Sequence, residues 1–306
     1  MTREEINEQK QKEIFKEQNK ETIKKTIKII LKITIAITLI IGLFLAYTTY
    51  ISTVKIGVRE YRIINKKIPE TFNGLKIIQF SDLHYGSTMY YENVKKMVKL
   101  INERKPDLVV FTGDLINKNY KLTTKEQEKL TIELNKIKAS LGKYAITGEE
   151  DKENTITIFN QSDFIVLKNS HELIYKNTTD PLLLIGLSSK LNNEINIENA
   201  YSYFREETHN SNIYTITLLH EPDTVSEILN TYNTDLFLAG HSHNGNIRIP
   251  FINFALKKEG AKKYDQDYYK LQNSKLYISS GLGTNNKNGI RLFTRPSINF
   301  FRLSNK

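Results

Sequence analysis

A short stretch early in the chain carries two side chains that could bind a metal ion together. Asp82 and His84 directly follow the apolar run 75–80, which predicts a buried strand. Residues two apart in an extended chain project to the same side, so both side chains could reach one point. Zn, Mn and Fe accept mixed nitrogen and oxygen ligands. The pair therefore predicts part of a metal site.

The same layout recurs four more times downstream. Apolar stretches at 108–111, 144–146, 213–219 and 236–238 each lead into candidate ligands, which are Asp114, then Glu149, Glu150 and Asp151, then His220, then His241 and His243. In open α/β sheets, ligands bind beyond the carboxyl ends of the strands. Strands placed side by side would bring these five ends together.

Each of these histidines could instead be an ordinary structural residue. A single His beside an apolar strand is commonly a hydrogen-bonded core group. Here four of the six histidines stand at strand ends, in company with Asp82 and Asp114. The other two, His171 and His209, lie in polar surroundings and we assign them no role. A shared metal site explains candidate ligands at five strand ends more simply than coincidence does.

Taken together, these motifs resemble the calcineurin-like metallophosphoesterases. That family has the pattern D-x-H, G-D, G-N-H-D/E, H and G-H-x-H, and this chain matches it in order at 82–84, 113–114, 148–151, 220 and 240–243. Segments 246–250, 263–265, 281–284 and 290–292 resemble its membrane-associated bacterial branch, so the resemblance covers residues 54–303. It implies an α/β fold, a four-layer α-β-β-α sandwich of two mixed sheets.

The resemblance also implies a set of metal ligands. Two divalent metal ions, Mn, Zn or Fe, would share Asp114 as a bridging ligand. The other ligands would be Asp82, His84 and His243 at one ion, and Glu149, His220 and His241 at the other. Such ions, ~3.5–4 Å apart, clamp the attacking and leaving oxygens of an in-line displacement. The implied activity is hydrolysis of a phosphoester or pyrophosphate bond by a metal-bound hydroxide.

One motif departs from the family pattern. Glu149 stands where the family has an asparagine ligand, and a carboxylate oxygen can ligate equally well. Glu150 stands where the family has the histidine that faces the leaving group, and we assign it as the candidate catalytic residue. With an ordinary pKa near ~4.3 it would be ionised at neutral pH. It could donate a proton only if burial or neighbouring carboxylates raised that pKa.

This departure leaves a second hypothesis open. The chain could be a membrane-anchored metal-binding protein of the same fold with little or no turnover, and bound metal without activity towards phosphoesters would identify it. A nucleic-acid-binding module rests only on the net charge of +10 and scattered tyrosines, so nucleic acid is not an expected partner. The chain has no cysteine, which excludes disulfides and thiolate ligands.

The N-terminal segment predicts a membrane anchor. Residues 1–32 form a charged tail, and residues 33–52 are twenty residues without a charge, ~30 Å long as a helix. A cleaved signal peptide would need a shorter apolar core and a small-residue cleavage site. A buried core helix is disfavoured by the position ahead of the domain at 53–306. The basic tail favours a cytoplasmic N-terminus, which places the domain of this single-pass protein outside the cytoplasm.

The remaining pattern predicts the elements that position the candidate ligands. We expect helices at 90–103, 125–139, 155–161, 200–206 and 224–231, and strands at 54–64, 75–80, 108–111, 144–147, 164–167, 172–175, 182–187, 213–219, 235–239, 247–249, 275–279 and 297–303. Asn244 and Gly245 predict a hairpin turn. We interpret 256–275 as a solvated loop, with a lip that contacts substrate as the alternative. By family analogy alone, the substrate could be lipid-linked.

Overall fold

We describe the fold from a computed structural model, which covers residues 2–46, 56–177, 179–206, 210, 212–243, 257–285, 291 and 294–306. His209, the hairpin expected at 244–245, the strand expected at 247–249 and residues 47–52 of the expected span lie outside these ranges. The chain forms two compact units, Met1–Thr48 and Thr49–Lys306.

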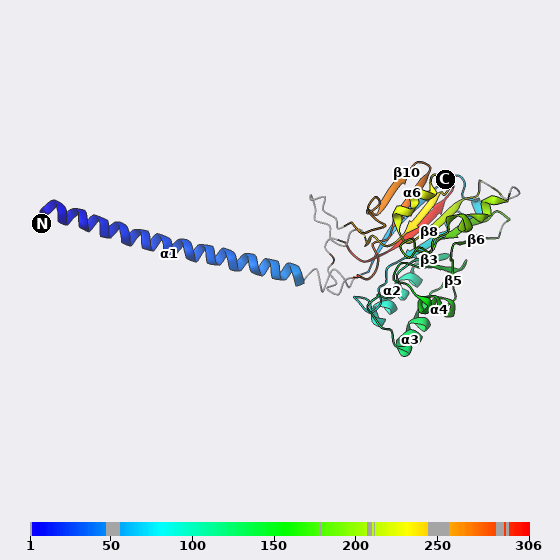
Figure 1. Cartoon of the computed structure of the whole chain (residues 1–306), viewed down its shortest axis with the longest axis horizontal. Helices are drawn as coiled ribbons and strands as arrows, with labels where there is room; N and C mark the ends of the chain where they lie inside the picture. Colours follow the sequence, from blue (N-terminus) through cyan, green and yellow to red (C-terminus); the bar gives the residue numbers. More distant parts are fainter. Residues whose placement is uncertain are drawn as a thin grey trace. The chain divides into compact units, whose positions relative to one another are not determined.

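The first unit is a single long helix, α1 (Arg3–Ala46), drawn in blue in Figure 1. The charged tail and the start of the apolar segment therefore belong to one continuous element. Ile37, Leu39 and Ile40 lie on different sides of this helix and are 51%, 63% and 66% exposed. A helix that is apolar all round needs an apolar environment. Within the described residues, Arg3–Phe44 is a helix long and apolar enough to cross a membrane.

The second unit contains two six-stranded mixed sheets. In strand order, the first sheet consists of β1 (Gly57–Ile64), β12 (Ser297–Ser304), β2 (Lys76–Phe80), β3 (Leu108–Thr112), β4 (Lys143–Ile146) and β5 (Phe164–Val166). β12 is parallel to β1 and antiparallel to β2, whereas β2 to β5 are mutually parallel. The last strand of the chain thus lies between its first two.

The second sheet repeats this mixture of directions. In strand order it consists of β10 (Tyr268–Leu271), β11 (Ser274–Ile278), β9 (Leu236–Ala239), β8 (Thr215–Leu219), β7 (Leu182–Gly186) and β6 (Ser170–Ile174). Its four central strands are parallel, and the edge strands β10 and β6 are antiparallel to their neighbours. Parallel strands buried on both faces read as continuous apolar runs, as β7 to β9 do.

Three apolar cores separate four layers. Alternate residues of a strand face opposite sides, so Val109 packs towards helices α2 (Tyr91–Glu103), α3 (Thr124–Asn135) and α4 (Glu153–Gln161), whereas Val110 packs against the second sheet. Phe237 belongs to the third core, beneath α5 (Ile197–Ala200) and α6 (Val225–Ile228). Figure 1 shows α2 to α4 on one side of the domain and α6 on the other. The α-β-β-α sandwich is thus confirmed.

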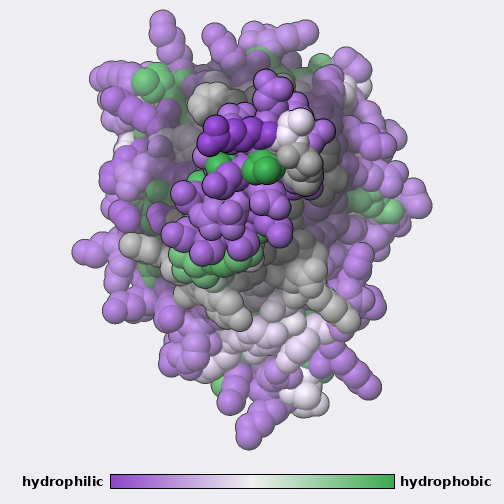
Figure 2. All heavy atoms as spheres, turned by 90° about the vertical axis from the view of Figure 1, so that its left-hand side faces the viewer, coloured by the Kyte–Doolittle hydropathy of each residue, from purple (hydrophilic) through white to green (hydrophobic). Residues whose placement is uncertain are grey.

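Short 3-10 turns and a polar surface complete the domain. The turns are Glu70–Phe72, Ser202–Arg205 and Pro222–Thr224. Most of the described residues visible in Figure 2 are hydrophilic, and hydrophobic side chains appear there only in small patches. This agrees with a net charge of +10 carried largely on the outside.

Four expectations for individual elements were wrong. The helix expected at 125–139 ends at Asn135. The Asn102 side chain donates to Lys136 O (2.8 Å) and accepts from Lys138 N (2.9 Å), which draws this backbone out of the helix. The segment 256–275 is not a simple loop, because it contains β10, an edge strand paired with β11. The helix expected at 200–206 is present only as the 3-10 turn Ser202–Arg205, and the helix expected at 224–231 is reduced to the four-residue α6.

Candidate metal centre

The carboxyl ends of five parallel strands meet at one edge of the sandwich. β2, β3 and β4 are neighbours in the first sheet, and β8 and β9 are neighbours in the second. Gln79, on β2, donates through Nε2 to Ala239 O at 2.8 Å and so joins the two sheets just beneath this edge. The sandwich therefore brings the candidate ligands together, as the sequence predicted.

The backbone at this edge turns sharply. Five non-glycine residues have a positive φ here, which are Asp82 (49°), His84 (43°), Asp114 (64°), His241 (65°) and His243 (48°). This left-handed conformation costs a residue with a Cβ on the order of 1–2 kcal/mol. Such strain persists where the surrounding structure fixes it, and it concentrates at functional sites.

Asp82, His84 and His243 form one group of candidate ligands. Asp82 Oδ1 lies 3.2 Å from His243 Nε2, and the Nε2 atoms of the two histidines lie 3.1 Å apart. The two rings stack with centroids 5.1 Å apart. All three side chains are fully buried. Donor atoms of these three residues lie within 4.8 Å of one another, an arrangement that a cation stabilises.

Glu149, His220 and His241 form a second group. Glu149 Oε2 lies 2.7 Å from His220 Nε2, and Glu149 Oε1 lies 3.0 Å from His241 Nδ1. Yet Glu149 Oε2, His220 Nε2 and His241 Nδ1 are buried and make no hydrogen bond of proper geometry within the described residues. Buried polar atoms are rarely left without a hydrogen-bond partner. Their lone pairs point at a shared space, so this donor set fits a metal ion.

Asp114 lies between the two groups. Its Oδ2 atom is 3.7 Å from His84 Nε2 and 3.4 Å from His220 Nε2. Donor atoms of Asp82, Asp114 and His220 lie within 4.8 Å of one another, as do those of His84, Asp114 and Glu150. One carboxylate is thus within reach of both groups.

Backbone carbonyls fix the tautomers of two histidines. His220 Nδ1 donates to Thr112 O at 2.6 Å, and His241 Nε2 donates to Glu259 O at 2.6 Å. Because a carbonyl only accepts, each ring must carry its proton on that nitrogen. The other nitrogen faces Glu149 and is the one available to ligate a metal, as in histidine ligands of metals.

Charges alternate within this buried cluster. Burial opposes ionisation of Asp82, but the nearby His243, His220 and His84 rings outweigh it and hold the carboxyl pKa below its ordinary value. Burial is likewise outweighed at Glu149, where His220 and His241 lower the pKa. Carboxylates therefore remain ionised here, as metal ligands must be.

Asp151, a further acid at the end of β4, has a structural position. Its carboxylate accepts the backbone N–H of Asp114 (2.7 Å), Leu115 (2.9 Å) and Gly148 (2.9 Å). Burial and the charge of Asp114 raise the pKa of Asp151 to about 7. It ties the loop after β3 to the loop after β4 and lies outside the four groups of candidate ligands.

Glu150 lies behind His84. Its Oε2 atom is 3.2 Å from His84 Nδ1 and accepts from Lys118 N at 2.9 Å. Burial favours the neutral acid, but His84 and the Lys118 N–H outweigh it and hold the Glu150 pKa below its ordinary value. The raised pKa required of a proton donor is therefore not found in this arrangement. The catalytic role of Glu150 stays a prediction.

Residues 257–264 form one side of this centre, which the sequence did not predict. Glu259 supplies the carbonyl that orients His241, and Lys258 Nζ donates to His241 O at 3.0 Å. Asp223 holds the segment by accepting the N–H groups of Lys262 (2.7 Å), Lys263 (3.0 Å) and Tyr264 (3.0 Å). Backbone contacts leave no trace in apolar periodicity, so no sequence signal identified them.

Two further residues have clear places. Arg291 is fully buried, with Nη1 donating to Ser280 O (2.8 Å) and Nη2 lying 3.4 Å from His243 Nδ1. The sequence analysis had noted it only as part of a resemblance. His171 lies on β6, where its ring packs on Tyr203 with centroids 5.9 Å apart. It is not among the candidate ligands in the described residues.

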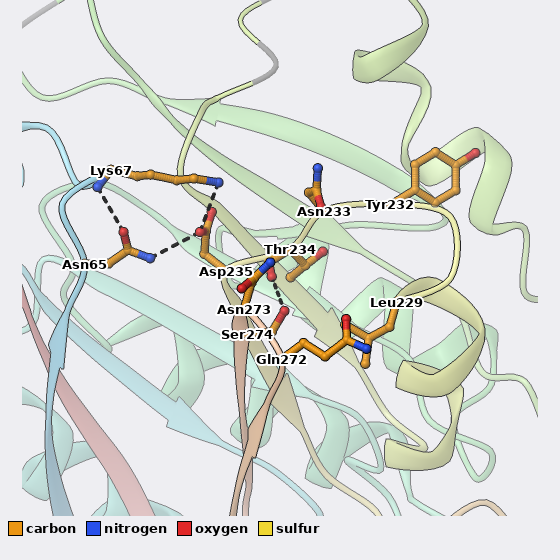
Figure 3. Close-up of a pocket in the computed structure, with 10 residues that line it drawn as sticks. All are labelled: Asn65, Lys67, Leu229, Tyr232, Asn233, Thr234, Asp235, Gln272, Asn273 and Ser274. Carbon is orange, nitrogen blue, oxygen red and sulfur yellow. Dashed lines mark hydrogen bonds and ion pairs between the residues drawn. The ribbon is translucent and has the colours of Figure 1, made fainter.

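A cavity of about 350 Å³ opens at the opposite ends of β9 and β11 (Figure 3). Lys67 and Asn65 both contact Asp235 Oδ1, at 3.3 Å and 3.2 Å. The positive charge of Lys67 and the negative charge of Asp235 therefore neutralise each other within the cavity. Gln272 and Asn273, from the turn between β10 and β11, face it from the other side. Its described lining has one residue of a metal-ligating type, Asp235. The cavity is separate from the metal centre.

Comparison with known proteins agrees with this geometry. A family model described as calcineurin-like phosphoesterase matches residues 75–245, more than half of the chain. The metallophosphoesterase YkuE of Bacillus subtilis is 29% identical over 262 residues, which cover 84% of this chain and 88% of that protein.

Two other relatives differ in how much they share. The UDP-2,3-diacylglucosamine pyrophosphatase LpxG of Chlamydia trachomatis is 28% identical over 238 residues, or 63% of this chain and 71% of that protein. A transmembrane protein with a metallophosphoesterase domain from Danio rerio is 27% identical over 197 residues. Those residues cover 60% of this chain but only 43% of the Danio protein, so this chain spans less than half of that relative.

Proposed function

The chain belongs to the calcineurin-like phosphoesterase family and is a metal-dependent phosphoester hydrolase. We propose that it works with two divalent cations, Mn, Zn or Fe. One cation would be held by Asp82, His84 and His243 and the other by Glu149, His220 and His241, and Asp114 would be shared between them. The observation that carries this proposal is the position of Asp114, within 3.7 Å of a histidine from each group.

The chain's own residues prepare this site before any metal arrives. Thr112 O and Glu259 O hold His220 and His241 with one nitrogen turned towards Glu149. The backbone N–H of Glu150 donates to Asp114 Oδ1 at 2.9 Å, which leaves Oδ2 facing the histidines. Divalent cations in such a site polarise a phosphoryl oxygen and lower the pKa of a coordinated water. Preorganised ligands spare the cost of arranging them during the reaction.

We propose a substrate with a phosphoester or pyrophosphate bond that is carried on a lipid. Two Chlamydia relatives are named as pyrophosphatases of a diacylated sugar nucleotide. An apolar N-terminal helix on this chain would hold the catalytic domain close to such a molecule. Lys258 contacts the candidate ligand His241, and its charge suits an anionic headgroup.

We further propose that residues 33–52 cross the cell membrane once, with the catalytic domain outside the cytoplasm. Because the chain has no cysteine, single replacements can be labelled selectively. A membrane-impermeant maleimide should label Lys125→Cys, in the exposed first turn of α3, on intact cells, and should leave Lys12→Cys unlabelled until the cells are broken. The reverse pattern would invert the orientation. If washing released the chain from the membranes, residues 33–52 would not be a membrane anchor.

The full chain in detergent, stripped of metal and reloaded with Mn, tests the hydrolase proposal. It should hydrolyse bis(p-nitrophenyl) phosphate or p-nitrophenyl phosphate. Asp114→Asn should lose this activity, while Asp163→Asn, the same exchange in an exposed loop, should keep it. Activity that survives in Asp114→Asn would show that Asp114 is not a ligand shared by two metal ions.

A second candidate function rests on Glu149 and Glu150, which replace the family's Asn-His pair. A protein of this fold could keep its metals and lose turnover. Two metal ions per chain without hydrolysis of any member of a phosphoester panel would favour this candidate.

A further inference from the structure

Glu150 and the metal centre lie on opposite sides of the His84 ring. On one side, His84 Nε2 is 3.1 Å from His243 Nε2 and 3.7 Å from Asp114 Oδ2. On the other, His84 Nδ1 is 3.2 Å from Glu150 Oε2. A carboxylate only accepts, so in this pair Nδ1 carries a proton, and Nε2 is the nitrogen that faces the centre.

The environment of Glu150 fixes it in this position. Its side chain is only 2% exposed. Oε2 also accepts the backbone N–H of Lys118 at 2.9 Å, and the Glu150 N–H donates to Asp114 Oδ1 at 2.9 Å. Glu150 therefore links the loops that follow β2, β3 and β4. A side chain whose Oε2 atom is held by both His84 and Lys118 is poorly placed to follow a departing leaving group.

His84 differs from the other histidines that are oriented through hydrogen bonds. His220 and His241 donate to neutral carbonyls, those of Thr112 and Glu259. His84 instead contacts a carboxylate, and hydrogen bonds to an ionised acceptor are about twice as strong as neutral ones. A carboxylate behind a ligating histidine fixes its orientation and raises its basicity.

We propose that Glu150 is a positioning residue for His84, and that the enzyme therefore acts on bonds whose leaving group departs as a stable anion, as in a pyrophosphate. This deepens the hydrolase function proposed above and rests on it. During hydrolysis the water oxygen bonds to phosphorus, the bond to the leaving oxygen breaks, and its electron pair stays on that oxygen. The protons of the water pass to solvent.

Leaving-group chemistry connects the two halves of this proposal. A leaving phosphate, with a second pKa of ~6, needs no proton at neutral pH. An alkoxide is about as basic as hydroxide, because the pKa of bulk water is ~15.7, and it departs far faster when it receives a proton. A positioned proton donor contributes ~10²–10⁴-fold to such a step. With Glu150 committed to His84, alkyl esters lose that contribution and pyrophosphates do not.

The test compares Glu150→Gln and Glu150→Ala with Glu153→Gln, an exposed carboxylate in the first turn of α4, in the full chain in detergent. The first readout is the affinity of the metal-free protein for Mn, from the EPR signal of free Mn. Loss of a carboxylate partner typically weakens a metal ~10–100-fold, so Glu150→Ala should lose this much at one site. Glu150→Gln keeps an acceptor and should lose less. Glu153→Gln should match wild type, and unchanged affinity in Glu150→Ala would overturn the positioning role.

The second readout is kcat/KM for aryl phosphodiesters whose phenols differ in pKa. Wild type should fall at least ~100-fold from p-nitrophenyl to phenyl leaving groups, the share that a proton donor would otherwise supply. Glu150→Gln should lower every rate and keep the same slope. The slope is that of log kcat/KM against the pKa of the leaving phenol. A shallow slope in wild type that becomes steeper in Glu150→Gln would make Glu150 the proton donor. A shallow slope in both proteins would contradict the proposed preference for leaving groups that depart as stable anions. If even p-nitrophenyl esters resist, the hydrolase proposal fails, while the metal affinities still decide the positioning role.

Discussion

Asp114 Oδ2 lies 3.4 Å from His220 Nε2, although these residues follow strands of different sheets. Asp114 comes after β3 in the first sheet, and His220 comes after β8 in the second. The contact can form only when the two sheets pack face to face with their carboxyl ends at the same edge. The sandwich itself thus assembles the candidate metal centre.

Gly113 should be indispensable for that contact. Its φ is +95°, and a Cβ on it would lie 2.2 Å from His220 Nδ1. Gly113→Ala should therefore displace His220 and weaken metal binding. Gly74→Ala is a matched control, because Gly74 has φ +83° with nothing within 4 Å of the added Cβ. The control should lose on the order of 1–2 kcal/mol of stability and keep its metals. Equal metal affinity in the two variants, by EPR titration, would contradict the close approach.

Metal removal should lower thermal stability. The cluster holds buried carboxylates and histidines in contact, and ligands that bind only the native state stabilise it by mass action. At a free metal concentration of 100 times Kd, one site contributes ~2.7 kcal/mol, or roughly 5–10 °C in Tm for a domain of this size. Thermal unfolding of the full chain in detergent, with chelator and then with Mn restored, measures the shift. A Tm indifferent to metal would count against a site built into the fold.

The packing of the two sheets can be tested through Ile216. This side chain is 1% exposed and belongs to the core between the sheets. Ile216→Ala should cost about 2–5 kcal/mol of unfolding free energy, through lost burial and the cavity left behind. Ile165→Ala is the control, because Ile165 is 45% exposed, and it should cost less than ~1 kcal/mol. Similar losses in the two variants would argue against a core at this position.

Lys143 should give the stability of the domain an alkaline pH dependence. Burial holds the pKa of its ammonium group below the ordinary value, while Nζ donates to Ser162 O at 2.7 Å. The unfolded chain keeps this proton up to ~10.4, so between the two pKa values it binds more protons than the native state. Native stability should rise as the pH increases through that window. The Tm of wild type should therefore increase relative to the Tm of Lys143→Met as the pH rises towards ~10.4. A difference in Tm that stays constant or shrinks over this range would contradict the lowered pKa of Lys143.

Much of the candidate centre could be predicted because its chemistry follows strand geometry. Asp82, Asp114 and His220 each stand where an apolar run stops, and parallel strands end at a common edge. The order of the sheets is harder, since β12 inserts between β1 and β2 through contacts between the two ends of the domain. No local pattern encodes such a pairing.

The partners of the ligands could not be predicted, for physical reasons. Glu259 orients His241 through a backbone carbonyl, which every residue type possesses. β10 is an edge strand whose residues alternate between exposed and half-buried, so Tyr268–Leu271 lacks the apolar signature of a core strand. The position of Glu150 behind His84 depends on a rotamer that the sequence does not specify.

The number of metal ions bound per chain tests the central claim most directly. Metal-free full-length protein in detergent, titrated with Mn and followed by EPR, should bind two ions per chain. Asp114→Asn should lose tight binding of both, since its neutral amide replaces a carboxylate that lies within 3.7 Å of a histidine from each group, and Asp163→Asn should bind two. One ion or none in wild type, or two ions held as tightly in Asp114→Asn, would contradict a dinuclear centre built around Asp114.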